Sequence, residues 1–211
     1  VMQNNTVIIG SSLYGKTNLL EYMIRYLAEH YTPEEFNFYV LDFGTRVLSV
    51  FDQLHHCGGV VCAGEDEKYR NLFKLIHKEM NDRKNRLLQL GVTSYSAYME
   101  LDANMHVAPM PLILLVIDNF TALRELYLTD KDELLDICRD GHSLGVTVVM
   151  TSTICSGIGY RYLSNFSNKI AYTCNDQSEY NSLFEYCKER PDAIPLGKIG
   201  RAVQQECRDR S

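Results

Sequence analysis

The stretch Thr6-Val7-Ile8-Ile9-Gly10-Ser11-Ser12-Leu13-Tyr14-Gly15-Lys16-Thr17 decides the fold of this chain. Its first four residues form a short apolar run, typical of a buried strand. From Lys16 to about Tyr31 the pattern is helical, with apolar residues at Leu19, Leu20, Met23, Ile24 and Leu27. The residues between strand and helix fit the spacing G-x-x-x-x-G-K-[ST], which predicts a loop that binds phosphate groups.

Each defining position of this loop has a physical reason. Gly10 and Gly15 allow backbone conformations and close approaches that a Cβ atom would hinder. Backbone N–H groups and the helix N-terminus point toward the phosphates, Lys16 reaches the β- and γ-phosphates, and the Thr17 hydroxyl ligates magnesium. We therefore predict that ATP with Mg²⁺ binds at Gly10, Ser11, Ser12, Leu13, Tyr14, Gly15, Lys16, Thr17 and Asn18. The alternative is a degenerate loop that keeps its shape without binding.

Strands and amphipathic helices alternate through the rest of the chain. Apolar runs predict strands at 36–41, 60–62, 112–117, 146–150 and 170–172, and helical spacing predicts helices from 66 as far as 90 and over 130–143. Residues 92–110 are expected to be rich in loops. Repeated βα units imply an α/β fold of the P-loop NTPase class (RecA-like), a three-layer α/β/α sandwich with a mainly parallel central sheet.

A second candidate site feature is Asp118, which follows the apolar run 112–117. In P-loop proteins such an acid holds Mg²⁺ through water, although a terminal Asp can simply cap a turn. The next residue is Asn119, where many related ATPases place a glutamate base. An amide cannot accept a proton from water, so we expect little hydrolysis. Thr151 and Ser152 end a central strand and could sense the γ-phosphate or satisfy turn backbone, whereas Asp42 is expected to cap a turn.

Composition narrows the possible functions. The chain has 211 residues, 21 Lys plus Arg against 27 Asp plus Glu, and a net charge of −6, which disfavours nucleic acid as a partner. Seven cysteines without a CxxC pair indicate a reducing compartment. The arginines at 83, 86, 161 and 201 are expected on a solvated surface. The chain reads as a single domain over 1–203 with a charged tail over 204–211.

The sequence resembles the FtsK/SpoIIIE-type ATPases, and among them the EssC/EccC motors of type VII secretion. The resemblance rests on the phosphate loop, Leu41-Asp42-Phe43-Gly44, Cys57-Gly58-Gly59-Val60-Val61, the helix Met80 to Leu88, Gly91-Val92, Ile117-Asp118-Asn119-Phe120, Gly145-Val146 and Gly197 to Ala202. It implies that Lys16 and Thr17 occupy the phosphate and magnesium positions and that Asp118 is the second acid.

The resemblance also implies a cellular setting. Such modules lie in tandem at the cytoplasmic face of the membrane, in a motor anchored by other parts of the chain. The resemblance implies that the full motor forms a hexamer and that modules of this kind recognise WXG100-type secreted substrates. Asn119, Leu13 in place of a common Gly, and Ser152 in place of Gln depart from the active pattern and favour a docking or regulatory module. An active motor domain that needs a neighbour, or a DNA translocase, are the alternatives. Elements before Thr6 are expected to be missing.

Overall fold

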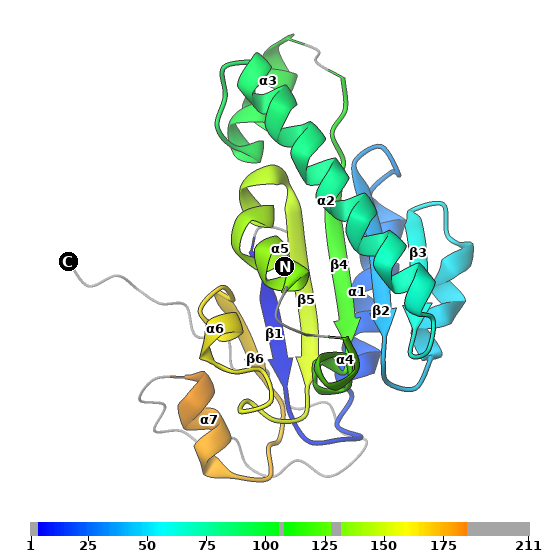
Figure 1. Cartoon of the computed structure of the whole chain (residues 1–211), viewed down its shortest axis with the longest axis vertical. Helices are drawn as coiled ribbons and strands as arrows, with labels where there is room; N and C mark the ends of the chain where they lie inside the picture. Colours follow the sequence, from blue (N-terminus) through cyan, green and yellow to red (C-terminus); the bar gives the residue numbers. More distant parts are fainter. Residues whose placement is uncertain (1–3, 106–107, 128–131, 185–211) are drawn as a thin grey trace, which may run out of the picture.

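A six-stranded parallel sheet forms the centre of the part of the chain that the computed structural model describes, residues 4–105, 108–127 and 132–184 (Figure 1). The strand order is β3-β2-β4-β5-β1-β6. Continuous apolar runs form the strands because both faces of a parallel sheet are covered. The strands are β1 (Thr6–Ile9), β2 (Phe36–Asp42), β3 (Cys57–Cys62), β4 (Leu112–Asp118), β5 (Val146–Ser152) and β6 (Asn168–Ala171).

Helices cover the two faces of this sheet unequally. On one face, α1 (Lys16–His30) and the 3-10 helix η1 (Val47–Gln53) pack through the apolar side chains Leu20, Ile24, Leu27, Leu48 and Phe51. The other face carries the larger core, to which the remaining helices contribute. These are α2 (Asp66–Gln89), α3 (Tyr95–Met105), α4 (Phe120–Tyr127), α5 (Glu133–Asp140), the 3-10 helix η2 (Gly141–Leu144), α6 (Tyr160–Leu163) and α7 (Gln177–Leu183).

The predicted α/β fold is confirmed, and strand order explains where a ligand site arises. Strand β5 separates β1 from β4, so the loops after β1 and β4 leave the sheet on either side of β5. All six strands end at the same edge of the sheet, the lower edge in Figure 1. Open parallel sheets bind their ligands at this edge.

The expectation of a loop over residues 92–110 is wrong, because helix α3 occupies Tyr95–Met105. Ser94 begins this helix, since its hydroxyl accepts a hydrogen bond from the Ala97 amide over 3.2 Å. Tyr98 is completely buried, and the Arg86 guanidinium lies over its ring at 5.1 Å from the centroid. The helix therefore depends on a contact with α2 that its own sequence, which has no clear amphipathic pattern, does not reveal.

Arg83 is also placed differently from the expectation of a solvated surface. Its side chain is 2% exposed and forms an ion pair with Glu79 over 2.8 Å. The guanidinium donates hydrogen bonds to the carbonyl oxygens of Leu144, Gly145 and Pro111 at 3.0, 3.2 and 2.7 Å. Arg83 thereby joins α2 to the backbone that leads into both β4 and β5.

Helix boundaries differ elsewhere in smaller ways. The helix expected over 130–143 is α5 (Glu133–Asp140) followed by η2, because Gly141 packs against Val146 and the chain tightens there. Strand β3 starts earlier than expected, at Cys57, and β6 ends at Ala171.

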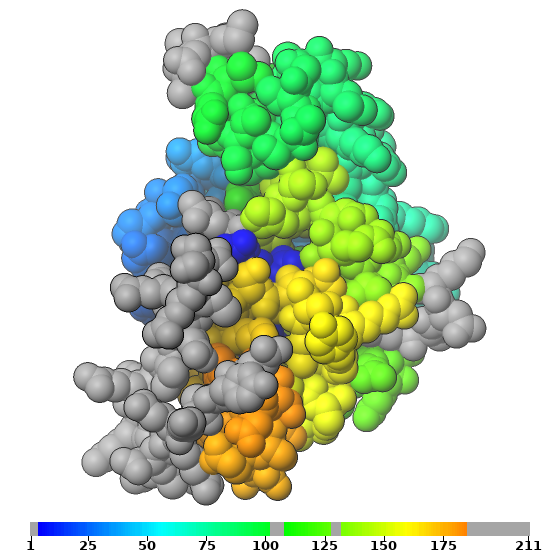
Figure 2. All heavy atoms as spheres, turned by 90° about the vertical axis from the view of Figure 1, so that its left-hand side faces the viewer, coloured from blue at the N-terminus to red at the C-terminus, as the bar shows by residue number. Residues whose placement is uncertain are grey.

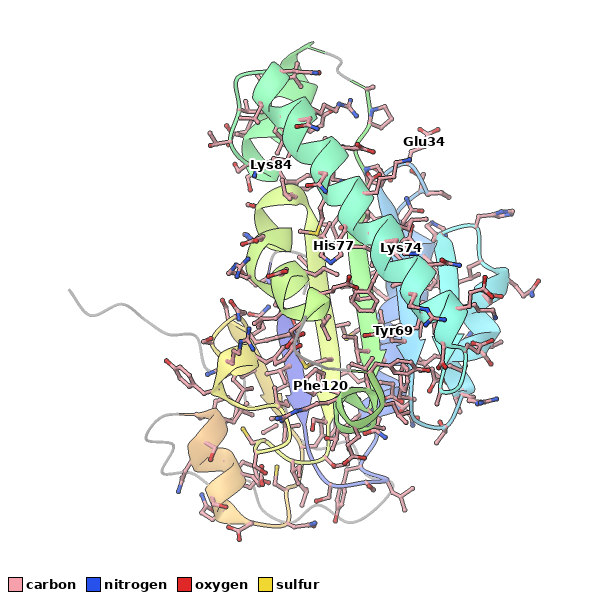
Figure 3. The ribbon with its side chains drawn as sticks, viewed as in Figure 1. Glu34, Tyr69, Lys74, His77, Lys84 and Phe120 are labelled. Carbon is pink, nitrogen blue, oxygen red and sulfur yellow. The ribbon has the colours of Figure 1, made fainter. Side chains whose placement is uncertain are left out.

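Helix α4 was not expected. Its Phe120, labelled in Figure 3, packs edge to face on Tyr162 with 4.9 Å between ring centroids. The predicted tail, 204–211, lies outside the described residues.

Candidate nucleotide-binding site

The loop between β1 and α1 has the backbone shape that its sequence predicts. Gly15 precedes α1 with a φ of 92°, a left-handed conformation that favours glycine. A Cβ atom at Gly10 would lie 2.6 Å from the Tyr172 Cβ, so that position also requires glycine. Leu13 occupies the tip of the loop with a φ of 69° and is 86% exposed. The two motif glycines are therefore explained by conformation at one position and by packing at the other.

Lys16 lies under the loop with 8% of its surface exposed. Its ammonium donates hydrogen bonds to the carbonyl oxygens of Gly10 and Ser11 at 2.7 and 2.8 Å. Burial lowers the pKa of Lys16, and the nearby Asp118 carboxylate opposes that shift. An ammonium has three N–H donors, so these two contacts leave one for a phosphate oxygen.

Asp118 lies between two hydroxyl groups at the end of β4. Thr17 donates a hydrogen bond to its Oδ2 atom over 3.0 Å, and Thr151 donates to its Oδ1 atom over 2.6 Å. Asp118 is 4% exposed. A Cβ atom at Gly44 would lie 2.6 Å from Asp118 Oδ2, so glycine leaves open the space beside this oxygen. A threonine hydroxyl and a carboxylate facing this space are the oxygen groups that Mg²⁺ prefers, so the residues fit that ion.

Asn119 occupies the position after the acid but does not point a free amide into the site. Its φ is 62°, and its backbone N–H donates to Thr151 Oγ1 over 2.9 Å. Its side-chain nitrogen donates to the carbonyl oxygen of Phe43 over 3.2 Å, and its side-chain oxygen lies 3.5 Å from the Ala122 amide. The side chain thus connects the end of β2 to the start of α4.

A cavity of about 380 Å³ collects these groups. Most of the predicted site residues line it: Ser12, Leu13, Gly15, Lys16, Thr17, Asn18, Asp118, Asn119, Thr151 and Ser152. Gly10, Ser11 and Tyr14 do not line it, although Gly10 and Ser11 hold Lys16. Sequence reasoning missed Gly44, Thr45, Val47 and Thr153. The Leu-Asp-Phe-Gly segment was the signal for the first of these, because its glycine faces Asp118.

The two hydroxyl candidates after β5 have different roles. Thr151 donates to Asp118, a contact that neither alternative named, and also accepts from the Asn119 backbone amide over 2.9 Å, which satisfies turn backbone. Ser152 is fully buried and donates to the carbonyl oxygen of Ile154 over 2.8 Å, which satisfies turn backbone. Asp42 caps the turn after β2, as expected, because its carboxylate accepts from the amides of Gly44, Arg46 and Leu48 at 3.0–3.1 Å.

A wider hollow of about 570 Å³ lies between α2 and α5, away from the carboxyl edge of the sheet. His77 and Lys84, both labelled on α2 in Figure 3, line it together with Asp136, Arg139 and Asp140 from α5. Its walls combine charges of both signs with apolar side chains. Phosphate-binding groups gather instead in the smaller cavity beneath the loop.

Comparison with known proteins agrees with this geometry. Residues 1–174 match the FtsK/SpoIIIE family. This chain belongs to that family. The chain is 31% identical over 199 residues to the ESX secretion system protein EccC of Geobacillus thermodenitrificans, covering 94% of this chain and 13% of that protein. The chain thus spans about an eighth of the length of this relative.

Two solved structures show the same family fold. One contains ATPases 2 and 3 of EssC from Geobacillus thermodenitrificans, with a TM-score of 0.86, 29% identity, and coverage of 97% of this chain and 38% of that one. The other is EccC (ATPases 2 and 3) of Thermomonospora curvata in complex with a signal sequence peptide, with a TM-score of 0.77, 26% identity and coverage of 83% and 32%. Within residues 4–105, 108–127 and 132–184, no helix is long and apolar enough to cross a bilayer.

Proposed function

We propose that this FtsK/SpoIIIE domain binds ATP with Mg²⁺ and hydrolyses it slowly or not at all. The observation that carries the proposal is the convergence of Lys16, Thr17 and Asp118 in one cavity beneath a glycine-bounded loop. The loop amides and the start of α1 would receive the β- and γ-phosphates, with Lys16 beside them. Bound Mg²⁺ would supply neutralisation of the phosphate charge.

Slow hydrolysis is expected because the residue after Asp118 is Asn119, which cannot act as a base. The side-chain amide of Asn119 has no basic atom. Its nitrogen donates to the Phe43 carbonyl oxygen and its oxygen lies near the Ala122 amide, so both ends of the amide face other parts of the protein. General-base catalysis contributes roughly 10²–10⁴-fold in enzymes that use it. Thr45 and Thr151, which also line the cavity, are hydroxyl groups that cannot act as bases at neutral pH. Among the described residues that line the cavity, Asp118 is the only carboxylate, and because it would hold Mg²⁺, no second acid stands there to activate water.

The module would serve a type VII secretion motor in substrate docking or regulation. Support comes from its relatives, which are named as secretion proteins, are far longer than this chain and include structures of tandem ATPases. One of them is seen with a signal sequence peptide. The partners we propose are neighbouring ATPase modules, a WXG100-type secreted substrate, and the membrane through other parts of the parent chain at its cytoplasmic face. A hexamer of the full motor is part of this proposal.

Calorimetry of the purified domain with ATP and Mg²⁺ tests the binding step. We expect micromolar affinity that depends on Mg²⁺ and is lost in Lys16→Ala, because the loop then lacks its only cation beneath the phosphates. Ser182→Ala is the matched control, since Ser182 lies exposed on α7 and bonds only within that helix. If the unmodified domain gives no heat of binding with ATP and Mg²⁺, the loop keeps its shape but does not bind nucleotide.

Two further measurements separate the alternative functions. Turnover that appears only after fusion to adjacent modules, and that depends on Lys16, would indicate an active motor domain completed by a neighbour. Hydrolysis stimulated by DNA would indicate a translocase, whereas the net charge of −6 leads us to expect no salt-sensitive DNA binding.

A further inference from the structure

The segment after β6 packs directly on the phosphate loop. The Ser11 backbone amide donates to the Thr173 carbonyl oxygen over 2.8 Å, and the Ser11 hydroxyl donates to Asn175 Oδ1 over 2.7 Å. Tyr172 lies so close to Gly10 that no side chain fits between them. The first turn of the loop is therefore held from outside the nucleotide cavity by residues 172–175.

Ser11 also contacts Lys16, which lines the nucleotide cavity. The Ser11 carbonyl oxygen accepts a hydrogen bond from the Lys16 ammonium over 2.8 Å. To bond oxygens of both the β- and γ-phosphates the ammonium needs two N–H donors, and its two carbonyl contacts, with Gly10 and Ser11, leave only one, so binding would draw it from one of these carbonyl oxygens. Ser11 is thus the residue at which a change in Lys16 would reach the segment after β6.

Helix α7 is bonded to the same segment. The Tyr180 hydroxyl lies 2.7 Å from the Cys174 amide, from which it accepts, and donates to the Tyr172 carbonyl oxygen over 3.0 Å. Tyr180 is 2% exposed. Glu179 accepts a hydrogen bond from the Cys155 amide in the loop after β5. Figure 2 shows α7 in orange against the yellow residues that follow β5, so α7 contacts both segments that flank the phosphate loop.

We propose that Asn175 is a positioning residue for the phosphate loop and that it couples the nucleotide site to helix α7. Nucleotide binding changes the contacts of Lys16 with Ser11, and Ser11 passes that change to Asn175 in the segment 172–175. Tyr180 joins this segment to α7 through its hydrogen bonds with Cys174 and Tyr172. The inference rests on the proposed binding of ATP.

Thermodynamic linkage makes the coupling measurable in both directions. If nucleotide stabilises α7 through Asn175, then removing the Asn175 side chain must weaken nucleotide binding. Coupled sites commonly influence one another by roughly 5- to 150-fold, and for one hydrogen bond we expect about five- to tenfold. A role limited to stabilising the fold would lower the melting temperature without changing how α7 responds to nucleotide.

Hydrogen–deuterium exchange of residues 177–183 tests the proposal, with ATP-γ-S and Mg²⁺ as the probe. In the unmodified protein and in Ser182→Ala, nucleotide should slow exchange of α7 about fivefold or more. In Asn175→Ala and in Tyr180→Phe this protection should disappear, and calorimetry should show affinity weakened by a similar factor in Asn175→Ala.

Three results would overturn the coupling. If the unmodified protein binds nucleotide but α7 exchanges at the same rate with and without it, the coupling is wrong and the proposed function stands. If α7 is protected equally in Asn175→Ala, the route through Asn175 is wrong. If the unmodified protein binds no nucleotide, both proposals fail together.

Discussion

The Thr151 hydroxyl donates a hydrogen bond to Asp118 Oδ1 over 2.6 Å and accepts one from the Asn119 amide over 2.9 Å. One side chain from β5 thereby orients the acid of β4 and the residue after it. Asp118 is buried and Asn119 is half-buried, so both groups depend on Thr151 for a hydrogen bond within the protein.

Thr151→Val should remove both contacts while keeping the size of the side chain. The carboxylate would then be oriented by Thr17 alone, and the Asn119 amide would lose its acceptor. We expect Mg²⁺-dependent nucleotide affinity to fall roughly tenfold and the free energy of unfolding to fall by about 1–3 kcal/mol. Calorimetry and urea unfolding measure the two effects. Unchanged affinity in a folded variant would contradict the role given to Thr151.

Replacing Asn119 with glutamate should not create an active ATPase. The backbone at 119 has a φ of 62°, where a residue other than Gly, Asn or Asp loses about 1–2 kcal/mol. Glu would also lose the amide donor to Phe43. We expect Asn119→Glu to be less stable with no gain in phosphate release, and Asn119→Gly to keep its stability within about 1 kcal/mol. Phosphate release from Asn119→Glu at ordinary ATPase rates would show that only the missing acid limits turnover.

Arg83→Ala should destabilise the fold far more than loss of a surface arginine. Arg83 is 2% exposed, and its loss removes a donor from the carbonyl oxygens of Leu144, Pro111 and Gly145, of which Gly145 keeps a hydrogen bond from the Ile113 amide. We expect a loss of about 3–5 kcal/mol in the free energy of unfolding, because each buried carbonyl left without a partner costs about 1–3 kcal/mol and the packing of the side chain is lost as well. Arg139→Ala is the control, because Arg139 is 58% exposed and should matter by about 0.5 kcal/mol at most. Equal effects of the two substitutions would contradict the structure.

Stability should decrease at alkaline pH partly because of Cys155. Burial, and then the nearby Glu179 carboxylate, raises the pKa of this thiol from 9.0 to about 11. As pH rises, the unfolded chain loses the thiol proton first while the folded chain keeps it. The contribution to stability is present below pH 9.0 and is lost up to about pH 11, at a slope approaching about 1.4 kcal/mol per pH unit.

Urea unfolding at about pH 8 and about pH 10 checks this sign. The unmodified protein should lose about 1 kcal/mol more over that interval than Cys155→Ala, in which the other thiols are unchanged. An equal loss in the two proteins would show that Cys155 titrates alike in the folded and unfolded chains.

Local patterns predicted the sheet, the phosphate loop and the acid that faces it. The strands at 6–9 and 112–117 are continuous apolar runs, and Gly15-Lys16-Thr17 carries its own spacing, so neighbours in the sequence suffice. Features made by distant residues were missed. Arg83 meets backbone more than 60 residues away at Leu144 and Gly145, and Ser11 meets Asn175 across 164 positions. No local pattern distinguishes such residues from ordinary surface polar residues.

The position of Asn119 shows a related limit. Its identity predicted the loss of a base, and that expectation remains a prediction. The left-handed backbone and the hydrogen bond to Phe43 depend on β2 lying beside β4, which the sequence implies only in outline. The chemistry of a side chain can thus be predicted from its type, whereas its direction depends on the strands around it.

The fate of the γ-phosphate in protein that has bound ATP tests the central claim most directly. The domain is mixed with γ-labelled ATP and Mg²⁺ in excess of nucleotide, separated from free ligand, and its bound label is identified over time, with Lys16→Ala as the control. We predict intact ATP on the unmodified domain and none on Lys16→Ala. Bound ADP with released phosphate after a few seconds would contradict the account, because the chain would then activate water although position 119 carries Asn in place of a glutamate base.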